Sequence, residues 1–263
     1  MKINILGVKV DNLSKNDVIE RISSYLNNED SQHLVTPNPE FVLAAQKDPQ
    51  FKKILNQAEV AIPDGTGLVF ASWWLKHLNL GNIIRFNNRI CGSDLVLDIA
   101  KIAEEQNKKI FILSRESTLS GLDEIQTRLT EKFSQLQIVG YQLKIGESKD
   151  KAVQKIIDSQ AEILLVTFGA PDQDKFIYNY RAQLPNLRLA AGVGGSFDFL
   201  CGKIKRAPKI FRQLGLEWIW RFIQEPRKRS KRIYRAFLVF HQQVFWYGLF
   251  TKINKKYVNK KYS

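Results

Sequence analysis

The sequence predicts an α/β fold, with a largely parallel sheet flanked by helices and a basic helical appendage at the C-terminal end. Short apolar runs rich in β-branched residues alternate with longer amphipathic stretches up to about residue 202. The 44% hydrophobic and 25% charged fractions of the 263 residues fit a globular protein. Residues 203–263 hold 17 Lys and Arg against two acidic residues, whereas residues 1–202 are nearly neutral. We therefore expect a Rossmann-like core over residues 1–202 and an appendage over residues 203–263.

The elements of the core follow from the sequence in order. After a short N-terminal strand region, Ser14 and Asp17 have the spacing of a capping box, which predicts a helix through about Leu26. Six apolar runs predict the strands of the sheet: His33–Val35, Ala58–Ile62, Ile110–Leu113, Gln137–Val139, Ile163–Phe168 and Leu189–Val193. Amphipathic patterns predict helices at Leu95–Glu105, Leu122–Phe133 and Ala152–Ser159. Because strands and helices alternate, we expect the strands to run parallel.

Glycine and polar residues collect after four of these runs. The segments are 36–40, 64–67, 169–174 and 192–198, and they are rich in Gly, Pro, Asn, Asp and Gln. Open α/β sheets bind ligands outside the carboxyl ends of their strands. We therefore expect all four segments to meet at one edge of a cleft.

The cysteines and histidines give no sign of a disulfide or a metal site. Cys91 and Cys201 lie far apart and lack a C-x-x-C spacing, so we expect two reduced thiols in a cytosolic protein. His33, His77 and His241 are scattered, and no G-x-S-x-G motif is present. We therefore expect no catalytic metal and no cofactor, and neither metal-dependent nor serine hydrolase chemistry.

Two apolar stretches bear on membrane binding and export. The apolar run ahead of Lys9 is too short for a secretory signal. Near the C-terminus, Ala236–Phe250 is interrupted by His241 and two glutamines, and it is shorter than the roughly 20 apolar residues of a membrane-spanning helix. We expect this second stretch to lie on a membrane without crossing it.

The segment Asp64-Gly65-Thr66-Gly67 is a candidate for chemistry. Its glycines would let backbone amides approach a phosphate or a sugar at a helix N-terminus. Asp64 would then lie at a strand end, where a general base is needed. A turn carboxylate that caps the next helix explains the same pattern, so both interpretations stay open at this point.

Three other segments also allow two interpretations each. Residues 192–195 are glycine-rich but lack the G-x-G-x-x-G spacing, so a tight loop against a nucleotide is plausible and NAD binding is not expected. Residues 172–174 have the D-x-D form of a diphosphate-bound metal site, but Pro171 before them favours the start of a helix. Arg85 and Arg89 suit either phosphate binding or an exposed surface.

The basic tail has its own candidate surface. At helical spacing, Arg221, Lys228 and Arg232 share one face, and Trp218 and Trp220 lie beside them. Such a stripe suits anionic headgroups or a diphosphate at an interface. A solvated basic face and binding to a nucleic-acid backbone are alternatives that the composition leaves open.

Taken in order, several segments together resemble the WecG/TagA/CpsF glycosyltransferases, also called glycosyltransferase family 26. The matching pieces are Thr36-Pro37-Asn38 with Glu40, Asp64-Gly65-x-Gly67, Arg89 with Gly92 and Asp94, Gly169-x-Pro171-x-Gln173, Gly192-Val193-Gly194-Gly195 with Phe197-Asp198, Gly202, Arg206-Ala207-Pro208, Glu217-Trp218 with Arg221, and Glu225-Pro226. The chain departs from the family pattern at Asp174, where Glu is usual, and at Ser114, where Gly is common. The ordered set is far more specific than any single motif.

The resemblance implies an inverting enzyme that moves a sugar from a UDP-sugar to an undecaprenyl-diphosphate-linked sugar. N-acetylmannosamine or another hexose would be transferred during assembly of teichoic acid, common antigen, capsule or exopolysaccharide. The implied partners are the UDP-sugar donor, the polyprenyl-diphosphate-linked acceptor, an anionic membrane surface and further copies of the chain; nucleic acid is not expected. The implied location is the inner face of the bacterial plasma membrane, with the protein bound peripherally.

The resemblance also assigns roles to residues. Asp64 is the implied base, and the other implied catalytic residues are Thr36, Asn38, Arg89 and Gln173. The implied substrate-binding residues are Gly65, Gly67, Gly169, Pro171, Gly192, Gly194, Gly195 and Asp198. The residues implied to contact the lipid diphosphate or the membrane are Arg206, Arg221, Lys228, Arg229 and Arg232.

Two rival functions remain possible from the residues alone. One is an RNA-binding protein with a basic tail on an α/β core. The other is a Rossmann-type enzyme that acts on a soluble nucleotide-linked substrate. The ordered set of motifs disfavours both.

Overall fold

Six parallel strands form the central sheet, in the order β4-β3-β8-β7-β5-β6. They are β3 (Gln32–Val35), β4 (Val60–Ala61), β5 (Ile110–Arg115), β6 (Ile138–Leu143), β7 (Ile163–Val166) and β8 (Leu189–Gly192). The computed structural model describes residues 1–78, 85–86, 90–208, 210–211 and 215–261. Each of the six apolar runs in the sequence overlaps one of these strands, which confirms the predicted α/β fold.

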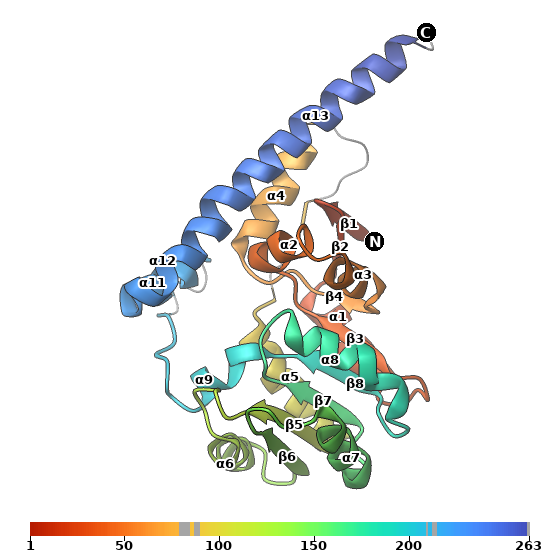
Figure 1. Cartoon of the computed structure of the whole chain (residues 1–263), viewed down its shortest axis with the longest axis vertical. Coiled ribbons are helices and arrows are strands. Elements are labelled where there is room, and N and C mark those ends of the chain that lie inside the picture. The colour runs from red at the N-terminus through yellow and green to blue at the C-terminus, as the bar shows by residue number, and fades with distance from the viewer. Residues whose placement is uncertain (79–84, 87–89, 209, 212–214, 262–263) are drawn as a thin grey trace.

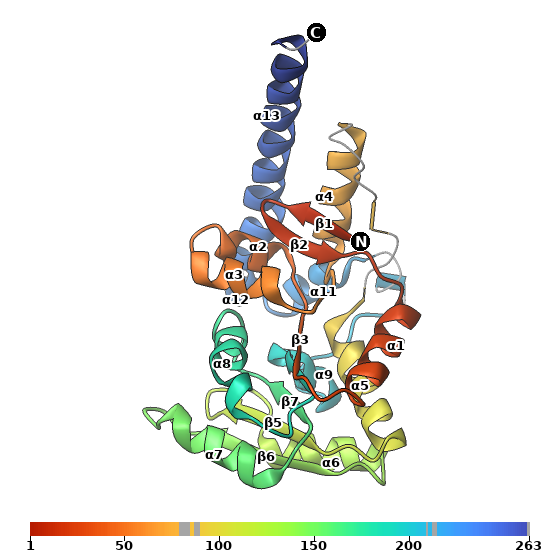
Figure 2. The same cartoon turned by 90° about the vertical axis from the view of Figure 1, so that its right-hand side faces the viewer.

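Helices cover both faces of this sheet (Figures 1 and 2). The helices of the core are α1 (Lys15–Tyr25), α2 (Pro39–Ala45), α3 (Pro49–Gln57), α4 (Thr66–His77), α5 (Gly92–Glu105), α6 (Leu122–Lys132), α7 (Lys149–Ser159), α8 (Asp172–Tyr180) and α9 (Phe197–Leu200), with short 3-10 turns η1 (Arg181–Gln183) and η2 (Gly194–Ser196). Side chains along β7 alternate between two buried clusters. Ile163 and Leu165 pack with α1, α5 and α6, whereas Leu164 and Val166 pack with α7 and α8.

The first helix begins with the predicted capping box. Ser14 Oγ accepts a hydrogen bond from the Asp17 amide at 3.1 Å, and Asp17 Oδ2 accepts one from the Ser14 amide at 2.8 Å. Ahead of this helix, β1 (Lys2–Ile5) and β2 (Val8–Asp11) form an antiparallel hairpin. The hairpin packs with α2, α3 and α4 in a third buried cluster.

Helices also form beyond residue 202, as predicted. They are α11 (Glu217–Gln224), α12 (Pro226–Tyr234), the π-helical turn η3 (Arg235–Val239) and α13 (Phe240–Lys261). The long helix α13 lies beside α4 in Figures 1 and 2. Phe240 and Val244 are buried in the cluster formed by the hairpin and α2–α4. A Cβ atom on Gly248 would lie 2.6 Å from Leu78 Cδ1, so the two helices approach each other very closely.

The apolar stretch 236–250 lies across η3 and α13. One side packs on α4, and large apolar side chains such as Phe237, Trp246 and Phe250 are exposed on the rest of its surface. None of the helices in the described ranges has both the length and the apolar character that a membrane-spanning helix needs.

Candidate active site

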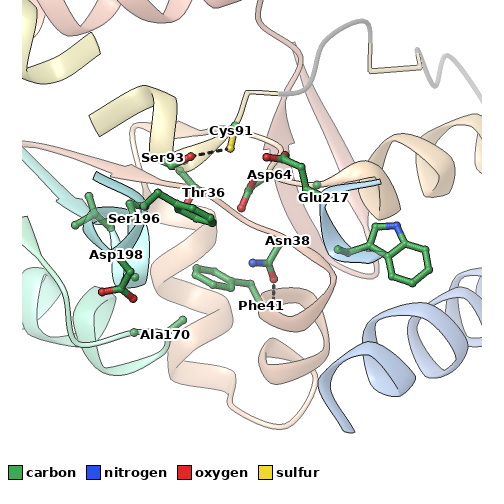
Figure 3. A pocket seen from close by; sticks show the side chains of 18 of the residues that line it. Thr36, Asn38, Phe41, Asp64, Cys91, Ser93, Ala170, Ser196, Asp198 and Glu217 are labelled. Atoms are coloured by element: carbon green, nitrogen blue, oxygen red, sulfur yellow. Dashed lines mark hydrogen bonds between the residues drawn. The ribbon is translucent and has the colours of Figure 1, made fainter. Parts of the chain in front are cut away.

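One pocket lies where the loops after β3, β4, β7 and β8 meet, and its volume is about 440 Å³. The core forms most of it, and residues of α11 and α12 complete its lining (Figure 3). The predicted site residues that line it are Thr36, Asn38, Asp64, Gly65, Gly169, Gln173, Gly192, Gly194, Gly195, Asp198, Arg229 and Arg232. The structure therefore confirms that the four polar segments meet at one edge of the sheet.

The other predicted site residues are placed differently. Gly67 lies on α4, where a Cβ atom would approach Pro39 Cγ to 2.5 Å, and it borders a neighbouring pocket. Pro171 directly precedes α8 without lining the main pocket. Arg206 forms an ion pair with Asp94, outside the pocket lining. Three predicted positions lie outside the described structure: Arg89 as a whole, and the side chains of Arg221 and Lys228.

The position of Asp64 is fixed by its own backbone. Its N–H donates to the carbonyl of Pro37 at 2.8 Å, which joins the loop after β4 to the loop after β3. Gly65 follows with a φ of +87°, a left-handed conformation that favours glycine, and α4 begins at the next residue. Figure 3 shows the carboxylates of Asp64 and Glu217 pointing into the same part of the pocket.

Asn38 shapes the rim of the pocket by capping α2. Its Oδ1 atom accepts hydrogen bonds from the amides of Glu40 and Phe41, at 2.9 and 3.0 Å. Pro39 occupies the first turn, where its missing N–H costs no hydrogen bond. The Thr-Pro-Asn segment therefore turns the chain from β3 into α2 at the pocket wall.

Gln173 holds two glycine-containing loops together. Its Oε1 atom accepts hydrogen bonds from the amides of Gly169 and Gly194, both at 3.0 Å. The side chain packs over Gly192, where a Cβ atom would come within 2.3 Å of Gln173 Nε2. Gln173 is only 2% exposed, so it fixes the loops after β7 and β8 in addition to lining the pocket.

The D-x-D segment is the beginning of a helix, as its favoured interpretation predicted. α8 starts at Asp172, and its first turn holds both acidic residues. Asp172 is exposed and pairs with Arg115 at 2.9 Å, whereas Asp174 is fully buried with His33 Nε2 3.5 Å away. Because the two carboxylates have different surroundings, they do not form a common diphosphate-metal site. Within the described residues, no group of three or more His, Cys, Asp or Glu is suited to hold a metal ion.

The basic stripe predicted on one continuous helix is wrong. α11 ends at Gln224, Glu225 has non-helical backbone angles, and Pro226 starts the separate helix α12. Proline lacks the N–H that a continuing helix would use, so Arg221 and Lys228 belong to different helices. The grouping of Arg221, Lys228 and Arg232 on a single face therefore fails.

Two arginines of α12 reach the pocket and are held there by carboxylates. Arg229 Nε donates to Glu225 Oε2 at 2.7 Å. Arg232 Nε donates to Glu40 Oε1 at 3.0 Å, and this ion pair ties α12 to the start of α2. The pocket thus combines positive charge from the C-terminal segment with the carboxylates of Asp64, Asp198 and Glu217.

Two helices begin at the pocket without a side-chain cap among the described residues. α4 follows Gly65 and α5 follows Cys91. At neither N-terminus does a capping side chain accept a hydrogen bond from the first-turn amides. Helix N-termini carry a partial positive charge and N–H groups without intrahelical partners. Together they make this part of the pocket suited to an anion such as a diphosphate.

The family model "Glycosyl transferase WecG/TagA/CpsF family" matches residues 3–254. The chain belongs to the WecG/TagA/CpsF glycosyltransferase family. It is therefore a glycosyltransferase of the hexosyltransferase class, and the resemblance inferred from the ordered motifs is confirmed. The match covers the α/β core together with α11, α12 and most of α13, so the C-terminal helices are part of the family pattern.

Similar WecG/TagA/CpsF proteins carry one common name, N-acetylglucosaminyldiphosphoundecaprenol N-acetyl-beta-D-mannosaminyltransferase. The protein of Staphylococcus aureus (strain MW2) is 31% identical over 226 residues, which cover 85% of each chain. The protein of Bacillus spizizenii is 30% identical over 206 residues, which cover 78% of this chain and 76% of that one. The protein of Bacillus subtilis (strain 168) is 28% identical over 82% of this chain and 78% of that one.

Sequence reasoning missed several residues of this WecG/TagA/CpsF pocket. Cys91 lines it, and its Sγ atom lies 3.1 Å from Ser93 Oγ. Burial raises the pKa of the Cys91 thiol, and the negative charges of Asp64 and Glu217 raise it further. The sequence alone predicts no more than a reduced thiol at Cys91. Glu217 belonged to a family motif without an assigned role, so the motif was the signal that pointed to it.

Proposed function

We propose that the protein transfers a hexose from a UDP-sugar to a sugar that is linked to a polyprenyl diphosphate, with inversion at the anomeric carbon. The shared name of the relatives supports N-acetylmannosamine as the first donor sugar to test and N-acetylglucosaminyl-diphosphoundecaprenol as the first acceptor. One observation supports the proposal most strongly: Asp64, two helix N-termini without side-chain caps and the arginines of α12 all lie at one pocket. Cell-surface polysaccharide assembly is the pathway class that follows from these substrates.

Asp64 acts as the general base in this proposal. Its carboxylate accepts the proton of the acceptor hydroxyl while the hydroxyl oxygen forms a bond to the anomeric carbon. The bond between that carbon and the UDP oxygen breaks on the opposite face, which inverts the configuration. General-base assistance of this kind contributes about 10² to 10⁴-fold to a rate.

Helix N-termini and backbone amides stabilise the negative charge of the leaving UDP in this proposal. The first turns of α4 and α5 line the pocket, and the loop from Gly192 to Gly195 adds backbone donors. Arg89 stays a predicted contact of the diphosphate. We propose that no metal is needed, so EDTA should leave turnover unchanged.

The C-terminal helices place the site next to a membrane in this proposal. The basic excess of residues 203–263 attracts anionic headgroups, and exposed aromatic side chains of α13 enter the interface. The acceptor would then be reached from the inner face of the bacterial plasma membrane. Arg229 and Arg232 line the pocket and would contact its diphosphate.

UDP release by the purified full-length protein tests the proposed function. The donors are UDP-N-acetylmannosamine, UDP-N-acetylglucosamine and UDP-glucose, each with and without an N-acetylglucosaminyl-diphospho-lipid acceptor in detergent. We expect acceptor-dependent release with one donor, the same rate in EDTA, and an inverted linkage in the product. If folded protein releases no UDP with any of these pairs, the proposed substrates are wrong.

A further inference from the structure

A second pocket, of about 410 Å³, adjoins the candidate active site. The two pockets share Gly65, Thr66, Gly215 and Trp218 in their linings. Their chemistry differs sharply. Carboxylates and guanidinium groups line the first pocket, whereas no Asp, Glu, Lys or Arg of the described chain lines the second.

Apolar and aromatic side chains from two parts of the chain form the second pocket. Phe70 comes from α4, and Ile233 and Phe237 come from α12 and η3. The ring of Phe237 stacks on Trp218, with centroids 5.3 Å apart, and the ring of His241 lies 4.9 Å from that of Phe70. Burial lowers the pKa of His241, so its imidazole is neutral near neutral pH. The lining is therefore uncharged.

Exposed apolar side chains continue from this pocket to the molecular surface. Phe70 packs against Trp73 one turn further along α4, and both are exposed. On the facing segment, Phe237 and Leu238 are exposed as well. An apolar path thus leads from the wall shared with the active site to the surface formed by α4 and the C-terminal helices.

We propose that the second pocket binds the first isoprenoid units of the acceptor's polyprenyl chain, with the diphosphate at the wall that the two pockets share. This inference rests on the proposed function. A polyprenyl diphosphate joins a charged group directly to an apolar chain, so its site needs a charged part and an apolar part in contact. The continuity of the two pockets provides that arrangement. Arg229 and Arg232 lie on the charged side, and the path along Phe70 leads the chain outward.

Binding measurements on the full-length protein test this pocket without requiring turnover. Farnesyl diphosphate and inorganic diphosphate both present a diphosphate group, and only the first carries an isoprenoid chain. In isothermal titration calorimetry, we expect farnesyl diphosphate to bind at least about tenfold more tightly, because several CH₂ groups leave water. Equal affinities for the two probes would overturn the proposal.

Two matched tryptophan substitutions test whether the gain in affinity from the farnesyl chain arises in the second pocket. Ala236 lines the second pocket, whereas Leu238 is exposed on the same π-helical turn outside the lining. Ala236→Trp should remove the gain from the farnesyl chain and leave the affinities for inorganic diphosphate and UDP unchanged. Leu238→Trp should keep the gain, and thermal unfolding would verify that both variants fold. An Ala236→Trp protein that keeps the full gain would place the chain elsewhere.

The same variants separate this inference from the proposed function. Acceptors with a farnesyl chain and with a methyl group in its place are compared in the UDP-release assay. The wild type should prefer the farnesyl acceptor by about tenfold in kcat/KM, and Ala236→Trp should lose that preference while it still uses the methyl acceptor. Release that never depends on an acceptor contradicts the proposed function. Release without a chain-length preference contradicts only the second pocket.

Discussion

The pKa of the Cys91 thiol depends on the charges in the pocket. This thiol lies at the start of α5, and Figure 3 shows it next to Asp64 and Glu217. Burial is the main cause that raises its pKa, and the two carboxylates add to the shift. Because the thiolate is the reactive form, Cys91 should react slowly around neutral pH although it faces a pocket.

The pH dependence of Cys91 alkylation tests this environment. Iodoacetamide labelling, followed peptide by peptide with mass spectrometry, should give a midpoint for Cys91 above that of an ordinary thiol. In Asp64→Asn the midpoint should move to lower pH, because one of the negative charges that disfavour the thiolate is gone. A midpoint that does not move would mean that Asp64 is uncharged or too distant to act on the thiol.

Individual residues were predictable as members of the pocket, but their contacts were not. The loop positions of Asn38 and Gln173 followed from where the strands end. The cap that Asn38 forms was not foreseen, and neither was the bridge from Gln173 to Gly169 and Gly194. That bridge connects loops far apart in the sequence, and its geometry depends on the spacing of β7 and β8 in the sheet.

The loops after β7 and β8 work as one unit because Gln173 joins them. Gly192 leaves the space that the Gln173 side chain fills, so the glycine and the glutamine depend on each other. Close packing therefore explains why a glycine stands at the end of β8. Its φ is not in the left-handed region, so the backbone conformation does not require glycine there.

Gly192→Ala should therefore damage both the fold and the activity. The added Cβ atom would displace the Gln173 amide and its two hydrogen bonds, which should cost about 1–3 kcal/mol in the free energy of unfolding. Turnover should fall at least about tenfold, since misplaced pocket groups lose catalysis steeply. The matched control is Gly121→Ala, because Gly121 has open space around its Cβ position and an ordinary φ of −69°. Urea unfolding and UDP release measure both effects, and equal behaviour of the two variants would contradict the pairing.

The helices beyond residue 202 show where local sequence patterns mislead. Their existence followed from composition and periodicity, but spacing alone placed Arg221 and Lys228 on one continuous helix. Pro226 breaks that helix, so the arginines that reach the pocket do so from α12 alone among the described side chains. The proline was visible in the sequence and was a sufficient signal for the break.

The first turns of α13 pack with the N-terminal hairpin and α4 in one buried cluster. Phe240 is fully buried there, whereas Phe250 on the same helix is 61% exposed. Phe240→Ala should lower the free energy of unfolding by about 3–5 kcal/mol, whereas Phe250→Ala should change it by less than about 0.5 kcal/mol. Urea unfolding measures both, and similar small effects would show that α13 does not stabilise the core.

Binding to anionic vesicles tests the proposed membrane surface. The full-length protein should sediment with vesicles that contain phosphatidylglycerol, and less so at high salt, because the attraction is partly electrostatic. Replacing Trp246 and Phe250 together with Ala should weaken binding roughly tenfold. Ile145→Ala changes an exposed apolar residue after β6 and serves as the control. Vesicle binding that ignores both salt and the two aromatic residues would contradict this surface.

The architecture was predictable to a large extent from the sequence, because local patterns decide strands and helices. The parallel sheet, the cleft edge and the capping box all depend on residues that are close together in the chain or on general rules of α/β folds. The packing of α13 on α4 was not predictable, since it depends on the close approach at Gly248 of segments about 170 residues apart.

The most direct test of the catalytic assignment is the turnover of Asp64→Asn. This variant keeps the size of the side chain and removes the basic carboxylate. Acceptor-dependent UDP release should fall by about 10² to 10⁴-fold while the affinity for UDP stays near that of the wild type. Asp123→Asn, an exposed change on α6 away from the pocket lining, should turn over normally. Wild-type turnover by Asp64→Asn would contradict the role of Asp64 as the general base.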